Sequence, residues 1–269
     1  MRASAKRGAS ALFLAFLPAI LLVAVPQRAS AQAGPPLLTN DPGTPGPKEW
    51  EINLGVQPVL RQGVSQIQLP QLDINYGVGE RIQLTVEVPY VIQSTNTPNL
   101  QTGWANAFTG VKWRFLDNWH GWNVSTFPQL ETGGPQGSVK NGIAGSGNRL
   151  LVPLEVQKNW GPMEFDFEAG YFFPFQGHDE RILGFAAGHQ FNKKFELIGE
   201  VYNDYAMGDL PHDTTWDMGG RYGFHKGLVL LFMAGRSFSG PASGQPTFLG
   251  YVGIQILLER NGRALHAEE

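Results

Sequence analysis

Three acidic side chains recur at every second position within residues 163–173. Glu164, Asp166 and Glu168 alternate there with Met163, three phenylalanines, Ala169 and Tyr171. Successive side chains of an extended strand point to opposite faces, so the three carboxylates share one face and the apolar residues share the other. Ionised groups of this kind must meet water or pair with bases. The pattern therefore predicts a strand with one charged face in contact with water and one apolar face.

The same alternation predicts more charged side chains on the wet face of neighbouring strands. The acidic set is Asp73, Glu87, Glu155, Glu196, Glu200, Asp204 and Asp217, and the basic set is Lys112, Arg114 and Arg221, with Arg236 as a further candidate. One interpretation is a transverse field that orients a polar or aromatic solute as it passes. The other is a set of ion-paired networks that fill a narrow interior. The sequence leaves both open.

The histidines do not form a catalytic or metal-binding pattern. The six are His120, His178, His189, His212, His225 and His266, and no Gly-x-Ser-x-Gly nucleophile motif accompanies them. The pairs His178-Asp179 and His212-Asp213 are isolated, and the glycine-rich stretch 142–147 lacks the lysine of a phosphate loop. We therefore expect no enzyme, no metal and no cofactor.

Alternation of period two recurs in segments of about ten residues, which is typical of membrane β-barrels. Residues 81–90 show it clearly, with Ile82, Leu84 and Val86 on one face and Gln83, Thr85 and Glu87 on the other. The predicted strands are 49–60, 65–78, 80–92, 104–116, 121–131, 149–159, 162–174, 180–191, 194–206, 214–224, 227–238 and 246–259. We predict an all-β fold, a transmembrane antiparallel up-and-down β-barrel of about 12 strands.

The predicted connections alternate between tight turns and longer loops. Tight turns fall near residues 77–80, 118–121, 159–162, 192–194 and 225–227, whereas residues 133–148 form the longest loop. Short periplasmic turns and long external loops are the rule in such barrels, so this sorting predicts the orientation. Tryptophans and tyrosines gather near the strand ends, as interfacial belts would require.

The chain divides into four predicted regions. Residues 1–31 have a basic start, an apolar run and the small-residue pattern of a cleaved signal peptide. Residues 32–48 form an extended, proline-rich periplasmic arm, which either hangs free or folds back to narrow the pore. The barrel covers 49–260 and a tail covers 261–269. With no cysteine and a net charge of −3, the sequence indicates neither disulfides nor a nucleic-acid partner.

Two stretches resemble a known family. PLLTNDPGTPG at 36–46, running into WEINL at 50–54, and LDINYGV at 72–78 are similar to the MetA-pathway of phenol degradation family of outer-membrane proteins. The resemblance implies a barrel with a part in the uptake of small aromatic or hydrophobic compounds. It supplies no established catalytic or binding residues.

These observations favour an outer-membrane channel for passive uptake of such molecules. Its expected partners are the bilayer and the barrel-assembly machinery, after export by the general secretory pathway; the solute is unknown. The final strand is followed by residues 260–269 and not by a terminal aromatic residue, so any insertion signal is internal to that tail. The alternatives are a structural or adhesive barrel with an occluded lumen, and a soluble β-sandwich that stays in solution without detergent.

Overall fold

The computed structural model describes residues 35–96, 99–176, 179–206 and 213–259. The predicted signal peptide, the predicted tail and three of the six histidines, His178, His212 and His266, lie outside these residues. The described chain is almost entirely sheet. Its strands are β1 (Trp50–Arg61), β2 (Val64–Val78), β3 (Ile82–Thr95), β4 (Gln101–Trp104), β5 (Ala107–Trp119), β6 (Trp122–Thr126), β7 (Gln129–Thr132), β8 (Arg149–Trp160), β9 (Met163–Pro174), β10 (Glu180–Asn192), β11 (Phe195–Ala206), β12 (Asp213–His225), β13 (Leu228–Ser237) and β14 (Phe248–Leu258).

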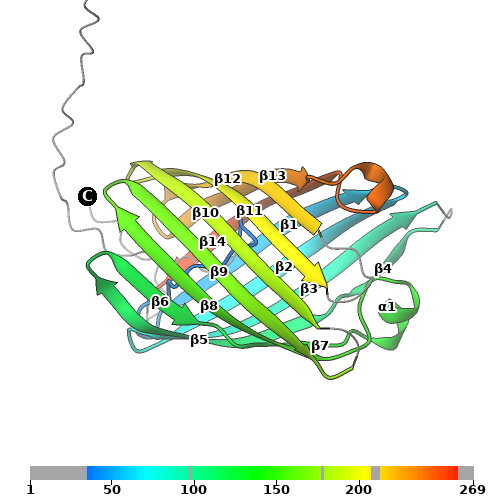
Figure 1. Ribbon diagram of the computed structural model, residues 1–269, viewed down its shortest axis with the longest axis horizontal. Helices are drawn as coiled ribbons and strands as arrows, with labels where there is room; N and C mark the ends of the chain where they lie inside the picture. The colour runs from blue at the N-terminus through cyan, green and yellow to red at the C-terminus, as the bar shows by residue number, and fades with distance from the viewer. Residues whose placement is uncertain (1–34, 97–98, 177–178, 207–212, 260–269) are drawn as a thin grey trace, which may run out of the picture.

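These segments form one closed antiparallel barrel (Figure 1). β1 pairs with β14 from Trp50↔Leu258 to Leu60↔Phe248, which closes the sheet on itself. β4 and β5 are two pieces of one barrel strand, since both pair with β3, and β6 and β7 are two pieces of the next, since both pair with β8. The fourteen segments therefore make twelve barrel strands, which confirms the predicted fold class and strand count.

The two broken strands depart from the predicted boundaries. The strand predicted at 121–131 is interrupted at Phe127 and Pro128, because proline has no N–H to donate to a ladder. The carbonyl of Pro128 still accepts a hydrogen bond from the Val111 N–H at 3.0 Å. The strand predicted at 104–116 begins three residues later as β5, and β4 occupies part of a predicted loop.

The wall of the barrel is apolar outside and polar inside. Along β3, Leu84 is 43% exposed, whereas Gln83 beside it is 1% exposed. Other outward side chains that are large, apolar and exposed include Val111, Leu154, Phe167, Phe185, Val201, Val252 and Ile254. This polarity is the reverse of a soluble fold and matches a barrel in lipid. A sandwich would bury the apolar faces between two sheets, so the soluble alternative does not fit.

The connections differ between the two ends of the barrel. At the turn end, β2–β3, β5–β6, β8–β9, β10–β11 and β12–β13 are joined by tight turns. Gly121 and Gly161 have φ of +78° and +60° there, a region open to glycine at no steric cost. The loop end carries the connection with α1 (Gln136–Lys140), the one with η1 (Pro241–Ser243) and also one short hairpin, β1–β2. No described helix is long and apolar enough to span a membrane.

Candidate functional site

The proline-rich segment before β1 lies inside the barrel. Thr39 and residues 41–45 are buried, Asn40 is partly buried, and Thr39 is only 4% exposed. Near the turn end the segment is held by backbone hydrogen bonds from Lys48 N to Gly77 O (2.9 Å) and from Gly77 N to Glu49 O (3.0 Å). A Cβ at Gly77 would lie 2.0 Å from the carbonyl oxygen of Gly46, so only glycine permits this approach. Residues 35–47, called the arm below, thus occupy the lumen.

Two carboxylates of the inner wall bind the backbone of the arm. The Glu200 carboxylate accepts hydrogen bonds from Leu38 N at 2.9 Å and from Thr39 N. The Glu168 carboxylate accepts from Asn40 N at 2.8 Å and from Asn40 Nδ2 at 3.3 Å. An extended segment with many prolines has no ladder partner for its N–H groups, and these two acids supply the acceptors. Glu168 and Glu200 therefore act as anchors of the arm.

A buried ion pair lies against the arm. Lys112 and Glu155 are both fully buried, with Nζ 3.3 Å from Oε2, and Lys112 also donates to the carbonyl oxygen of Asp41. The Ser125 hydroxyl donates to Glu155 at 2.5 Å. Because each buried charge has a partner, the desolvation penalty of this pair is offset.

Apart from Arg236, the remaining charged residues that the sequence singled out are distributed along the inner wall. Arg221 lies 3.4 Å from Glu196, and Arg114 lies 3.5 Å from Asp117. Asp166 and Asp217 are buried, whereas Glu164, Asp204 and Glu87 are only partly buried. The structure thus joins Lys112 to Glu155 and Arg221 to Glu196, and brings Glu168 and Glu200 to the arm.

Arg236 lies on the outer surface, so its suggested place in the lumen is wrong. It is exposed, and it pairs in register with Trp216, which is 39% exposed on the outer face. The odd-numbered residues Met233 and Ser237 of the same strand face inward and are buried. The phase of the strand therefore turns Arg236 outward.

A cavity of about 700 Å³ lies between the arm and the loop that contains α1. Pro35, Pro36, Leu37, Leu38 and Asn40 of the arm line it on one side, and residues 143–145 of the loop line it on another. The barrel wall adds aromatic side chains, amides, carboxylates and one guanidinium group: Phe108, Phe127, Tyr251, Gln57, Gln68, Gln71, Asp73, Asn75, Gln83, Glu87, Asn106, Gln129, Glu131 and Arg149. The arm is thus one wall of a chamber that the barrel encloses.

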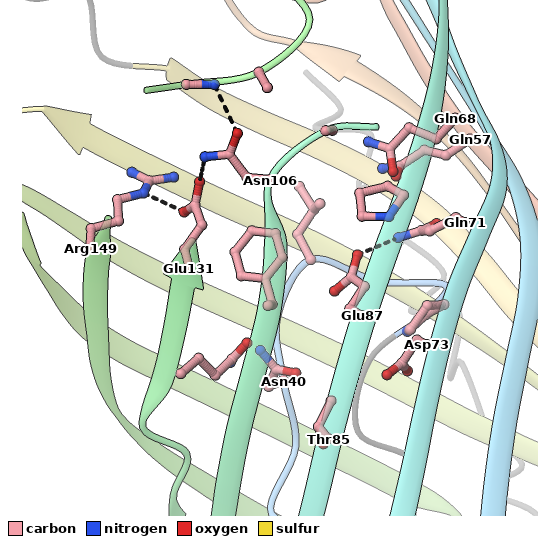
Figure 2. A pocket seen from close by; sticks show the side chains of 18 of the residues that line it. Asn40, Gln57, Gln68, Gln71, Asp73, Thr85, Glu87, Asn106, Glu131 and Arg149 are labelled. Atoms are coloured by element: carbon pink, nitrogen blue, oxygen red, sulfur yellow. Dashed lines mark hydrogen bonds and ion pairs between the residues drawn. The ribbon is translucent and has the colours of Figure 1, made fainter. Parts of the chain in front are cut away.

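Figure 2 shows a chain of polar contacts across one side of this cavity. Arg149 forms ion pairs with Glu131 and with Glu180, the latter at 2.5 Å, and lies over the Phe172 ring at 4.0 Å. Asn106 donates to Glu131 at 2.7 Å and accepts from Gly145 N at 2.8 Å. Asn106 therefore ties the loop to the barrel wall.

The amides of this cavity were not singled out from the sequence. In β2 the pairing register with β3 shifts between Gln68 and Gln71, so inward residues are even-numbered before the bulge and odd-numbered after it. A strict period-two pattern therefore fails across this strand, whereas the Leu69-Pro70 step inside it signals an interruption. The sequence signal that could have found these amides is the presence of uncharged polar residues on the lumen-facing side of the predicted strands.

No family model and no curated protein matches the chain. Among solved structures, it resembles an outer membrane channel from Pseudomonas putida F1 with a TM-score of 0.62, at 9% identity, over 84% of this chain and all of that one. It also resembles the NanC porin (TM-score 0.54, 8% identity) and the KdgM porin (TM-score 0.53, 14% identity), each over 77% of this chain and 98% of the other. At these identities the likeness shows the fold alone, that of outer-membrane barrels.

Proposed function

We propose that this chain is an outer-membrane channel that admits small aromatic or hydrophobic molecules by passive diffusion. The observation that carries the proposal is the cavity of about 700 Å³ inside a closed barrel with an apolar exterior. The volume is within the range of small-molecule sites. The rings of Phe108, Phe127 and Tyr251 line it beside polar groups, which suits a small ring-bearing solute. The solved channel and porins that share the fold support the proposal at the level of architecture.

The proposed setting follows the usual barrel convention. Residues 1–31 are removed as a signal peptide after export, the barrel-assembly machinery inserts the barrel, the turn end faces the periplasm and the loop end faces outward. Solute then enters the cavity from the loop end. Passage to the periplasm requires the arm to move, because the buried arm lies between the cavity and the turn end. We propose no enzymatic step.

A structural or adhesive barrel with an occluded lumen is the second candidate. The same arm favours it, since Glu168 and Glu200 fix the arm in place and ion pairs occupy the space around it. In that case the loops would do the binding and the lumen would conduct nothing. Conductance therefore separates the two candidates.

The test is single-channel recording of the mature chain in planar bilayers, with benzyl alcohol added as a small aromatic solute. A channel gives discrete current steps that the solute interrupts. The variant Gln57→Trp fills part of the cavity and should reduce both the current and the interruptions, whereas Val86→Trp, on the lipid-facing surface, should leave them unchanged. Absence of current steps from protein that shows a heat-modifiable gel shift would support the occluded barrel and overturn the channel.

A further inference from the structure

One wall of the cavity is formed by residues that carry hydrogen-bond acceptors without donors among the described residues. Gln68, Gln71 and Asp73 line the cavity, and their oxygens Gln68 Oε1, Gln71 Oε1 and Asp73 Oδ1 are buried and have no hydrogen-bond partner among the described residues. Asp73 is only 4% exposed. Figure 2 shows the side chains of Gln68, Gln71 and Asp73 on one wall, with Gln57 and Glu87 beside them. The three oxygens come from one strand, β2, on either side of its bulge.

Buried polar atoms almost always have a partner, so this group calls for one. An acceptor that is left unpaired loses about 1–3 kcal/mol of solvation free energy. A carbonyl or carboxylate oxygen can only accept, and its partner must therefore donate. The hydroxyl of Tyr251, which is 2% exposed and also lines the cavity, has no hydrogen-bond partner among the described residues either. The missing partner is thus rich in N–H or O–H donors.

The charges around the cavity favour a cation as that donor. Of the described residues that line it, Asp73, Glu87 and Glu131 are acidic and Arg149 is basic. Arg149 is already engaged by Glu131 and by Glu180. The Glu87 carboxylate accepts a hydrogen bond from the amide of Gln71 at 3.2 Å. The β2–β3 wall therefore carries negative charge with no cation beside it in the cavity lining.

We propose that this wall is a binding site for a small organic ammonium carried on an apolar or aromatic body. An ammonium group has three N–H donors and no acceptor, which matches an array of acceptor oxygens. Its body lies against the Phe108 and Tyr251 rings that line the same cavity. The aromatic faces also favour a positive charge. The inference names the solute class for the channel proposed above and so rests on that function.

Tyr251 is held in place by two residues without side chains. A Cβ at Gly55 or at Gly253 would lie 2.4 Å or 2.5 Å from atoms of the Tyr251 side chain. Gly55 and Gly253 are cross-strand partners on the inner wall, so the ring lies across both strands. The phenol is thus fixed at the cavity and does not fold away from it.

The test is isothermal titration calorimetry of the full mature chain in detergent with three ligands that share one ring. Benzylamine is a cation, benzyl alcohol is neutral and benzoate is an anion. We expect benzylamine to bind at least tenfold more tightly than benzyl alcohol, and benzoate not to bind. Equal affinity for benzylamine and benzyl alcohol would overturn the ammonium site and would indicate a neutral hydroxyl ligand instead.

Three variants locate the site. Asp73→Asn keeps an oxygen for the hydrogen bonds from Asn53 and Asn75 (each 2.9 Å) and should raise the Kd of benzylamine about tenfold, since bonds to charged groups are the stronger ones. Glu87→Gln should also raise the Kd of benzylamine about tenfold, and it replaces Asp73→Asn in the test if that variant does not fold. Asp204→Asn removes an equal charge from β11, outside the cavity lining, and should leave the Kd within about twofold.

The outcomes separate this site from the channel function. Calorimetry reports binding without permeation, so benzylamine can bind in a protein that conducts nothing, and that result would refute only the channel. A conducting protein whose affinity for benzylamine is unaffected by both Asp73→Asn and Glu87→Gln would refute only the site.

Discussion

The Glu200→Ala variant tests whether the arm controls access through the lumen. It removes the acceptor of two arm N–H groups, those of Leu38 and Thr39. Each buried N–H left without a partner costs about 1–3 kcal/mol, so docking of the arm should weaken by roughly 2–6 kcal/mol. Water can enter the space vacated by the side chain, which favours the lower end of that range. Even about 2 kcal/mol raises the ratio of undocked to docked arm roughly thirtyfold.

The absence of cysteine from the chain supplies a direct assay. A Thr39→Cys substitution places one thiol at a position that is 4% exposed. We expect slow labelling by a polar maleimide in the otherwise unchanged protein and labelling about thirtyfold faster when Glu200→Ala is added. The time-averaged conductance should rise in parallel. Val201→Ala, one residue along on the lipid-facing side, is the matched control and should change neither quantity.

One result would refute this reasoning. If Glu200→Ala folds, as a heat-modifiable gel shift would show, and both the labelling rate and the conductance stay at the level of the control, the anchors do not hold the arm in the permeation path. Glu200→Gln gives an intermediate test, since an amide keeps one acceptor oxygen but loses the charge that strengthens the bond.

Three further predictions concern the lumen. Lys112→Met leaves the Glu155 carboxylate buried without its cation, so the free energy of unfolding should fall by about 3–5 kcal/mol and the temperature of the gel-shift transition should fall with it. Adding Glu155→Gln should restore most of that stability. A double variant as unstable as Lys112→Met alone would contradict the pairing. Gly77→Ala puts a Cβ 2.0 Å from the Gly46 carbonyl oxygen, so the Thr39→Cys thiol should label faster, and an unchanged rate would mean that the arm does not touch this turn. Replacing the acidic side chains of β9 by asparagine should shift the reversal potential away from cation selectivity, and an unchanged potential would place them outside the ion path. Those side chains are Glu164, Asp166 and Glu168.

The strands could be predicted from the sequence because their signal is local. In β3 and β9, alternate residues meet lipid or the lumen, and each environment selects its own residue types. The alternation of Leu84 and Val86 with Gln83 and Thr85 therefore predicts both that this segment is a strand and which of its side chains face the lumen. The same logic led to the twelve strands and to the inward carboxylates of β9.

Local alternation fails wherever the backbone changes phase. The bulge between Gln68 and Gln71 reverses which parity faces inward, and Pro128 divides one barrel strand into β6 and β7. Arg236 faces outward because the register of β13 with β12 puts it opposite Trp216, and the sequence of β13 alone does not give that register. These features depend on pairing with a neighbouring strand, which one segment does not specify.

The sequence by itself determined a β-barrel of alternating polarity with a charged interior, since lipid and water act on each residue separately. Only the tertiary structure decided what fills that interior. The hydrogen bond from the Thr39 N–H to Glu200, the pair of Lys112 with Glu155, and the Asp73 oxygen that has no partner among the described residues all depend on how the strands and the arm are placed in the closed barrel. Closure brings segments distant in the chain within hydrogen-bond reach, and polar side chains then pair by distance in space. The order of the polar residues along the sequence does not predict these distances.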